Sequence, residues 1–157
     1  GVLTDLKRRT FSAPEAAMPE PLVNLARRFR AEVPGLERFY PNEANAIDYR
    51  RARGHYLGPH CDDRQLSGPI LVNLCLAGAA TMTYRRDTAV NRGTATTRSS
   101  STTTEKLAEQ VRILLPRRSL QIQAGTIRYR YSHAIARDDF HDERRVSITF
   151  RMNMHPG

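Results

Sequence analysis

Short strand-like segments that follow one another closely limit the fold of this chain more than any other feature. Apolar and polar residues alternate within several of them, which is typical of β-strands with one buried face. The expected strands cover residues 47–49, 56–57, 70–78, 80–84, 111–116, 119–125, 127–135 and 146–154. Because the strands are short and evenly spaced, they predict a β-sandwich or jelly roll rather than a βαβ protein.

One helix is expected ahead of all these strands, over residues 21–33. Apolar residues recur there at helical spacing, and Pro34 and Gly35 end the pattern. The apolar face is formed by Leu22, Leu25, Ala26 and Phe29. Since such a helix packs against a sheet, the predicted class is mainly β (α+β), with a helix that flanks the jelly roll.

The length of 157 residues predicts one domain, because two ordinary domains need a longer chain. Residues 1–20 lack an apolar period and are expected to form an arm or linker, which leaves residues 21–157 for the domain. Residues 87–104 contain almost nothing that could join a core, so they predict a flexible loop. That loop is either an inserted segment or a functional one.

The formal net charge of +9 favours an acidic partner such as RNA or DNA. However, Lys7 and Lys106 are the only lysines among 25 basic residues, and arginine-rich codon usage explains such a bias equally well. No apolar run approaches the roughly 18 residues of a membrane-spanning helix. Two cysteines are too few for a disulfide framework, so an intracellular compartment is expected. The chain begins with Gly1, which indicates a fragment or processed form whose targeting signal can lie outside it.

His60 and Asp62 form an H-x-D pair. In an extended segment every second side chain points to the same face, so the imidazole and the carboxylate are expected together, with Cys61 facing away. His133 lies in a later expected strand. Two histidines and one carboxylate form the ligand set of non-haem Fe(II) oxygenases, which leaves positions on the ion open, whereas structural zinc needs a fourth ligand. We therefore predict His60, Asp62 and His133 as metal ligands and catalytic residues.

The last expected strand has one polar and one apolar face. Alternation places Arg145, Ser147, Thr149 and Arg151 on the polar face. It places Val146, Ile148, Phe150 and Met152 on the apolar face, toward the helix. A solvated strand would explain the polar face, but arginine also binds a carboxylate through two parallel hydrogen bonds. The strand therefore suits a dicarboxylate such as 2-oxoglutarate.

Together these motifs resemble the AlkB family of Fe(II)- and 2-oxoglutarate-dependent dioxygenases. The stretch LLPRRSLQIQAGTIRYRYSHAI and the strand RRVSITFR are similar to corresponding parts of eukaryotic AlkB homologues. The similarity extends over about residues 41–84 and 111–152. It implies a double-stranded β-helix fold, with Fe(II) and 2-oxoglutarate as cofactors.

The resemblance also implies roles for residues outside the metal site. By it, Arg145 and Tyr49 hold the distal carboxylate of 2-oxoglutarate, and Arg151 lies near the carboxylate beside the metal. Ser147 belongs to the same cosubstrate site and stands where bacterial members carry asparagine. The chain departs from the family at Ile47, where asparagine is usual.

The function implied is oxidative demethylation of a methylated nucleic acid or protein. The basic charge favours nucleic acid, whereas the short spacing from His133 to Arg145 resembles the eukaryotic homologue that acts on methyl-lysine in proteins. The alternative is an AlkB-fold structural or binding subunit of a larger assembly, such as a ribonucleoprotein. It is motivated by the short region ahead of Tyr49, the basic arm and the Ser/Thr-rich loop.

Overall fold

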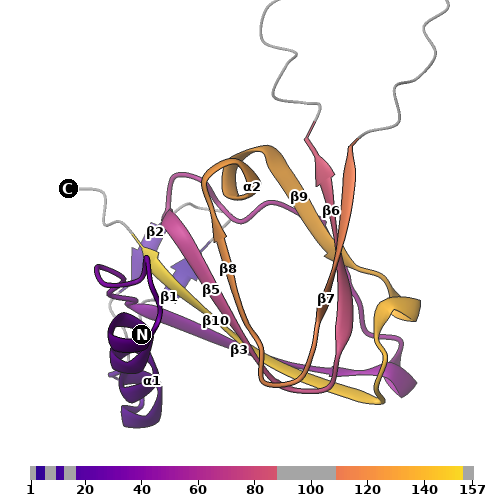
Figure 1. Ribbon diagram of the computed structural model, residues 1–157, viewed down its shortest axis with the longest axis horizontal. Helices are drawn as coiled ribbons and strands as arrows, with labels where there is room; N and C mark the ends of the chain where they lie inside the picture. The colour runs from indigo at the N-terminus through magenta and orange to yellow at the C-terminus, as the bar shows by residue number, and fades with distance from the viewer. Residues whose placement is uncertain (1–2, 6–9, 13–16, 88–108, 154–157) are drawn as a thin grey trace, which may run out of the picture.

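Two antiparallel sheets of four strands each face one another and form the body of the protein (Figure 1). The structure is a computed structural model, which describes residues 3–5, 10–12, 17–87 and 109–153. In chain order its elements are β1 (Leu3–Asp5), β2 (Thr10–Ser12), α1 (Glu20–Glu32), β3 (Glu43–Arg50), η1 (Arg51–Arg53), β4 (Leu57–His60), β5 (Ser67–Ala77), β6 (Ala80–Arg86), β7 (Gln110–Leu115), β8 (Leu120–Ala124), α2 (Gly125–Arg130), β9 (Tyr131–Ile135), η3 (Arg137–Asp139) and β10 (Arg144–Asn153).

The chain passes repeatedly from one sheet to the other. One sheet has the order β3-β10-β5-β8 and the second has the order β4-β9-β6-β7. Strands that are neighbours in a sheet are therefore mostly distant in sequence, as in a double-stranded β-helix. The predicted mainly β fold of the jelly-roll type is confirmed.

Helix α1 packs on the outer face of the sheet that contains β10 (Figure 1). Pro21 lies in its first turn, where a missing N–H is harmless. Ala26 and Phe29 are buried, and the Phe29 ring meets Phe150 of β10 edge to face, with ring centroids 5.2 Å apart. The predicted helix and its apolar face are confirmed.

Strand β10 separates two different environments. Phe150 and Ile148 point toward α1 and belong to the outer apolar cluster, as the alternation predicts. Arg145 and Ser147 are buried on the opposite face, between the two sheets. Since β10 pairs with β3 on one side and with β5 on the other, its side chains lie at the centre of their sheet.

The expected strand over residues 127–135 is wrong in its first half. Residues Gly125–Arg130 form the short helix α2, and the strand begins only at Tyr131. Gly125 has a φ of 57°, a conformation that glycine adopts without strain, and this allows the chain to turn after β8. The helix turns Arg128 into the interior, whereas Tyr129 is partly exposed.

Two of the expected features fall at least partly on residues that are not described. Within residues 1–20, β1 and β2 pair with each other in a separate two-stranded sheet, and whether this segment acts as an arm stays a prediction. The expected loop over residues 87–104 lies, apart from Asp87, outside the described residues.

Candidate active site

His60, Asp62 and His133 lie together between the two sheets. One ligand atom from each side chain lies within 4.8 Å of the others, as required for a shared metal ion. The register of β4 and β9 makes His60 and His133 direct cross-strand partners, and their ring centroids are 4.3 Å apart. Asp62 follows the end of β4 by two residues, with its Oδ2 atom 3.6 Å from Nε2 of His133. The structure thus brings the three predicted residues together.

Cys61, between two of the predicted ligands, faces elsewhere. Its Sγ atom donates to the carbonyl of Tyr131 at 3.3 Å and accepts from Arg64 at 3.2 Å. This agrees with the prediction that the thiol points away from the imidazole and carboxylate. The metal-binding group among the described residues therefore has three members and no thiolate.

The backbone orients the His60 ring for metal binding. Its Nδ1 atom lies 2.8 Å from the carbonyl oxygen of Gly58, which can only accept a hydrogen bond. The proton is therefore on Nδ1, and the lone pair of Nε2 is free for a metal ion. Metal-binding histidines usually donate the N–H of their other ring nitrogen to a backbone carbonyl or a carboxylate in this way.

Burial and charge set the protonation of the other two candidate ligands. Burial lowers the pKa of His133 to about 4, and the nearby His60 adds to this effect while Asp62 opposes it. Burial works against the ionisation of Asp62, but the charge and hydrogen bonds of Arg151 outweigh it and lower the pKa of the carboxyl group. Near neutral pH the site therefore presents a neutral imidazole and a carboxylate, the forms that bind a cation.

Arg151 is already engaged by two carboxylates. It donates to Oδ1 of Asp62 from Nη2 at 2.8 Å and from Nε at 3.2 Å, and from Nη1 to Glu43 at 3.1 Å. Arg151 thus lies beside the candidate ligand Asp62, and its predicted place near the 2-oxoglutarate carboxylate stays a prediction. This arrangement holds the Asp62 carboxylate so that Oδ2 faces His133.

The remaining predicted cosubstrate residues line the same cavity as the three candidate ligands. Arg145 is only 2% exposed, and its Nη1 donates to Oγ of Ser147 at 2.8 Å. Tyr49 is its partner in the register of β3 and β10, with the ring centroid 5.8 Å from the guanidinium carbon. No carboxylate pairs with Arg145 within the described part of the chain, and its buried Nε atom lacks a partner there.

Several residues of this cavity were not predicted from the sequence. Asn73 accepts from Arg145 at 3.3 Å and donates to Thr149 at 2.8 Å, and Gln121 donates to the hydroxyl of Tyr84 at 2.7 Å. The signal that could have identified them is a polar residue on the inner face of an apolar strand. Asn73 interrupts the run ILVNLCL, where such a residue is costly unless it is hydrogen-bonded.

The residues of this cavity fit an iron ion and a dicarboxylate. Two imidazoles and one carboxylate form the donor set of non-haem Fe(II) sites. A buried arginine without an acidic partner is costly by several kcal/mol unless an anion compensates it, and Arg145 is in that position. The free Nε of Arg145 and its fork-shaped guanidinium suit a carboxylate.

A double-stranded β-helix with this site defines the class of protein as a non-haem iron oxygenase of the type that uses a dicarboxylate cosubstrate. A sequence model of the 2OG-Fe(II) oxygenase superfamily matches residues 5–151. The chain belongs to this superfamily, which implies Fe(II) and 2-oxoglutarate as its cofactors.

Two curated relatives confirm the resemblance to AlkB-like enzymes. Alpha-ketoglutarate-dependent dioxygenase alkB homolog 4 of Mus musculus is 34% identical over 134 residues, which cover 75% of this chain and 43% of the relative. The protein of the same name from Homo sapiens is 35% identical over 132 residues, with the same coverage of 75% and 43%. The chain thus spans less than half the length of these relatives.

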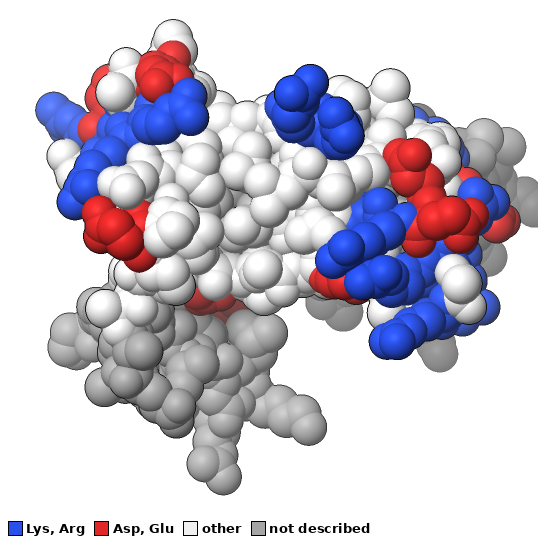
Figure 2. Space-filling model, turned by 90° about the horizontal axis from the view of Figure 1, so that it is seen from below, with Lys and Arg blue, Asp and Glu red and all other residues white. Residues whose placement is uncertain are grey.

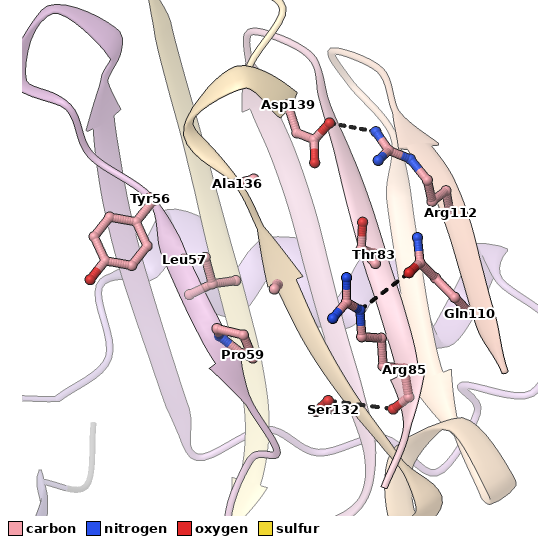
Figure 3. A pocket seen from close by; sticks show the side chains of 11 residues that line it. Tyr56, Leu57, Pro59, Thr83, Arg85, Gln110, Arg112, Ser132, Ala136 and Asp139 are labelled. Atoms are coloured by element: carbon pink, nitrogen blue, oxygen red, sulfur yellow. Dashed lines mark hydrogen bonds and ion pairs between the residues drawn. The ribbon is translucent and has the colours of Figure 1, made fainter. Parts of the chain in front are cut away.

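A second hollow, of about 320 Å³, lies on the outer face of the other sheet (Figure 3). Its floor is formed by the small side chains of β9 that alternate with His133, among them Ser132 and Ala134. Arg112 and Asp139 form an ion pair at one wall, with 2.5 Å between their charged groups. The β4-β9-β6-β7 sheet separates this hollow from the candidate active site.

The basic side chains do not form one continuous surface on the face shown in Figure 2. Basic and acidic groups lie side by side at its two ends, and the middle is uncharged apart from one separate basic cluster near the upper edge. Several arginines are paired locally, as Arg28 is with Glu32 at 3.0 Å and Arg144 with Asp48 at 2.9 Å. In the described part of the chain, no helix is long and apolar enough to cross a membrane.

The depressed pKa of His133 predicts a pH-dependent stability of the metal-free protein. His133 takes up a proton near pH 6.5 when unfolded but only near pH 4 when folded. The unfolded state therefore binds more protons between these values, and the free energy of unfolding should fall by up to about 3 kcal/mol as the pH decreases through them. Urea unfolding at a series of pH values measures this slope.

Two variants show whether His133 causes the slope. His133→Gln should flatten it, because the titrating group is lost. His141→Gln should leave it unchanged, because that side chain is exposed and its hydrogen-bond partner among the described residues is Thr81. Equal slopes in wild type and His133→Gln would show that His133 is not the responsible group.

Proposed function

We propose that this chain is a 2-oxoglutarate-dependent demethylase that oxidises N-methyl groups on a nucleic acid or a protein inside the cell. The observation that carries the proposal is the position of Arg145, buried without an acidic partner in the cavity that also holds His60, Asp62 and His133. Such an arginine suits one carboxylate of a cosubstrate, and the three candidate ligands beside it leave an ion accessible from one face for a second carboxylate.

In this proposal His60, Asp62 and His133 hold Fe(II). Bound Fe(II) and 2-oxoglutarate supply the oxidation of a C–H bond by O₂, coupled to the conversion of 2-oxoglutarate to succinate and CO₂. Asp62 contributes its charge through Oδ2, while Arg151 holds Oδ1. The hydrogen bond from His60 to Gly58 keeps one imidazole in the tautomer that binds the ion.

Arg145, Tyr49 and Ser147 form the proposed site for the distal carboxylate of 2-oxoglutarate. Burial raises the pKa of Tyr49, and this effect outweighs the opposing charge of Arg145. The phenol therefore keeps its proton at neutral pH and can donate a hydrogen bond to a carboxylate. Ser147 holds the guanidinium of Arg145 in place from two residues along the strand.

A methylated macromolecule fits this chemistry because a hydroxylated N-methyl group leaves as formaldehyde and restores the N–H group. The net charge of +9 supports a nucleic acid as the substrate. The local pairing of arginines with acidic residues weakens this argument, because those arginines are already neutralised. Both substrate classes are therefore kept in the proposal, and the first experiment separates them.

The experiment incubates the purified protein with Fe(II), ascorbate, 2-oxoglutarate and a panel of methylated DNA, RNA and peptides. Succinate and formaldehyde should form together with one class of substrate, in equal amounts. Asp62→Ala, which removes one of three ligands, should abolish both products while the protein stays folded. Absence of turnover from the wild type with every substrate would contradict the proposal and favour a binding subunit.

The position of Arg145 predicts that its replacement specifically weakens the binding of 2-oxoglutarate. Arg145→Gln should raise the Kd of 2-oxoglutarate about 10- to 100-fold, because charge-assisted hydrogen bonds contribute about 1.5–3 kcal/mol, while Mn(II) affinity stays close to that of the wild type. Isothermal titration of the Mn(II)-loaded protein measures both constants.

Arg144→Gln is the matched control for this prediction. Arg144 is the neighbouring arginine on β10, but it is exposed and pairs with Asp48. Its replacement should leave the Kd of 2-oxoglutarate unchanged. Equal losses in the two variants would mean that overall charge, and not the buried guanidinium, determines cosubstrate binding.

A further inference from the structure

Arg128 is a buried arginine that the proposed chemistry does not use. It lies on α2 and is 2% exposed, although a charged side chain at that depth needs strong compensation. Among the described residues, no carboxylate accepts a hydrogen bond from it. Its nearest aromatic neighbour is Tyr129, whose ring centroid is 5.3 Å from the guanidinium carbon.

Three backbone carbonyls take the place of an acidic partner. Nη1 of Arg128 donates to the carbonyl of Asp62 at 3.0 Å, and Nη2 donates to Asp63 at 2.5 Å and to Ser67 at 3.2 Å. The first two belong to the segment that connects β4 to β5 and carries the candidate ligand Asp62, and the third is that of the first residue of β5. A single guanidinium therefore binds both ends of this segment.

The same segment has its own internal support. Oδ1 of Asp63 accepts from the backbone N–H groups of Gln65 and Leu66, both at 2.8 Å. These bonds close a local turn but do not attach it to the rest of the domain. Arg128 and Arg151, which holds the Asp62 carboxylate, attach it to the domain, together with the ion pair of Arg64 with Asp87 at 3.1 Å.

Helix α2 also leads directly into β9, on which His133 lies (Figure 1). Arg128 therefore connects the segment that carries Asp62 to the segment that carries His133. Because this part of the chain forms α2 and not the expected strand, the side chain of Arg128 points toward the three carbonyls. If the same residues formed an extended strand, Arg128 would not connect these carbonyls to the segment that carries His133.

We propose that Arg128 is a positioning residue of the metal centre, which fixes Asp62 relative to His133 through the backbone carbonyls of residues 62–67. The inference rests on the proposed role of Asp62 and His133 as metal ligands. It assigns a function to a buried charge that contacts neither the ligand atoms nor the cavity.

The test compares Mn(II) binding by the full chain in wild type, Arg128→Met and Arg128→Lys, measured by electron paramagnetic resonance. Arg128→Met should raise the Kd of Mn(II) about 10- to 100-fold, as changes behind metal ligands commonly do. Arg128→Lys keeps the charge without the fork, so its Kd should lie between the two. If Arg128→Met does not fold, the comparison of wild type with Arg128→Lys decides.

Two control variants separate positioning from general destabilisation. Arg130→Met removes an exposed arginine of the same helix and should leave the Kd unchanged. Phe150→Leu weakens the apolar cluster on the far face of β10 and should lower the melting temperature without a change in Kd. The absorption bands of the Co(II)-loaded protein should change in the Arg128 variants alone, because they respond to ligand geometry.

Hydrogen exchange gives a readout that needs no metal. The backbone amides of residues 63–67 should exchange faster in Arg128→Lys, while those of β10 keep their wild-type rates. A folded Arg128 variant with wild-type Kd, Co(II) spectrum and exchange would overturn the inference. If the wild type itself binds no Mn(II), the proposed function fails instead, and the exchange result alone reports on the role of Arg128 in the segment.

Discussion

The difference between the two faces of β10 is the constraint on which the remaining structure depends. One face joins Phe150 to the apolar cluster under α1, and the other places Arg145 between the sheets. A guanidinium at that depth is costly unless hydrogen-bond acceptors or an anion surround it. The cavity between the sheets is therefore lined with polar side chains at a position where a sandwich protein usually has its core.

The candidate metal centre follows from strand pairing combined with one loop. Pairing of β4 with β9 sets His60 against His133, so two candidate ligands from distant parts of the sequence meet. Asp62 lies in the loop beyond β4, where no strand pairing fixes it. Arg151 holds its carboxylate and the buried Arg128 holds its backbone, and this explains why two arginines lie around a single aspartate.

Periodicity in the sequence was sufficient for the parts of the site that lie in regular strands. The alternation in β10 predicted the inward positions of Arg145 and Ser147, and the H-x-D spacing predicted a shared site for His60 and Asp62. It failed at α2, because the alternating residues before Tyr131 also permit a helix once Gly125 turns the chain. Asn73 and Glu43 were missed because their partners, Arg145 and Arg151, come from strands far along the chain, and single-strand patterns contain no information on such pairs.

The most direct test of this account is a crystal structure of the protein with Mn(II) and 2-oxoglutarate, with the metal located by its anomalous scattering. The account predicts one anomalous peak, bound by Nε2 of His60, Oδ2 of Asp62 and a ring nitrogen of His133. It also predicts that the distal carboxylate of 2-oxoglutarate contacts Arg145. A metal bound elsewhere, a fourth protein ligand, or a cosubstrate that leaves Arg145 without an anionic partner would contradict it.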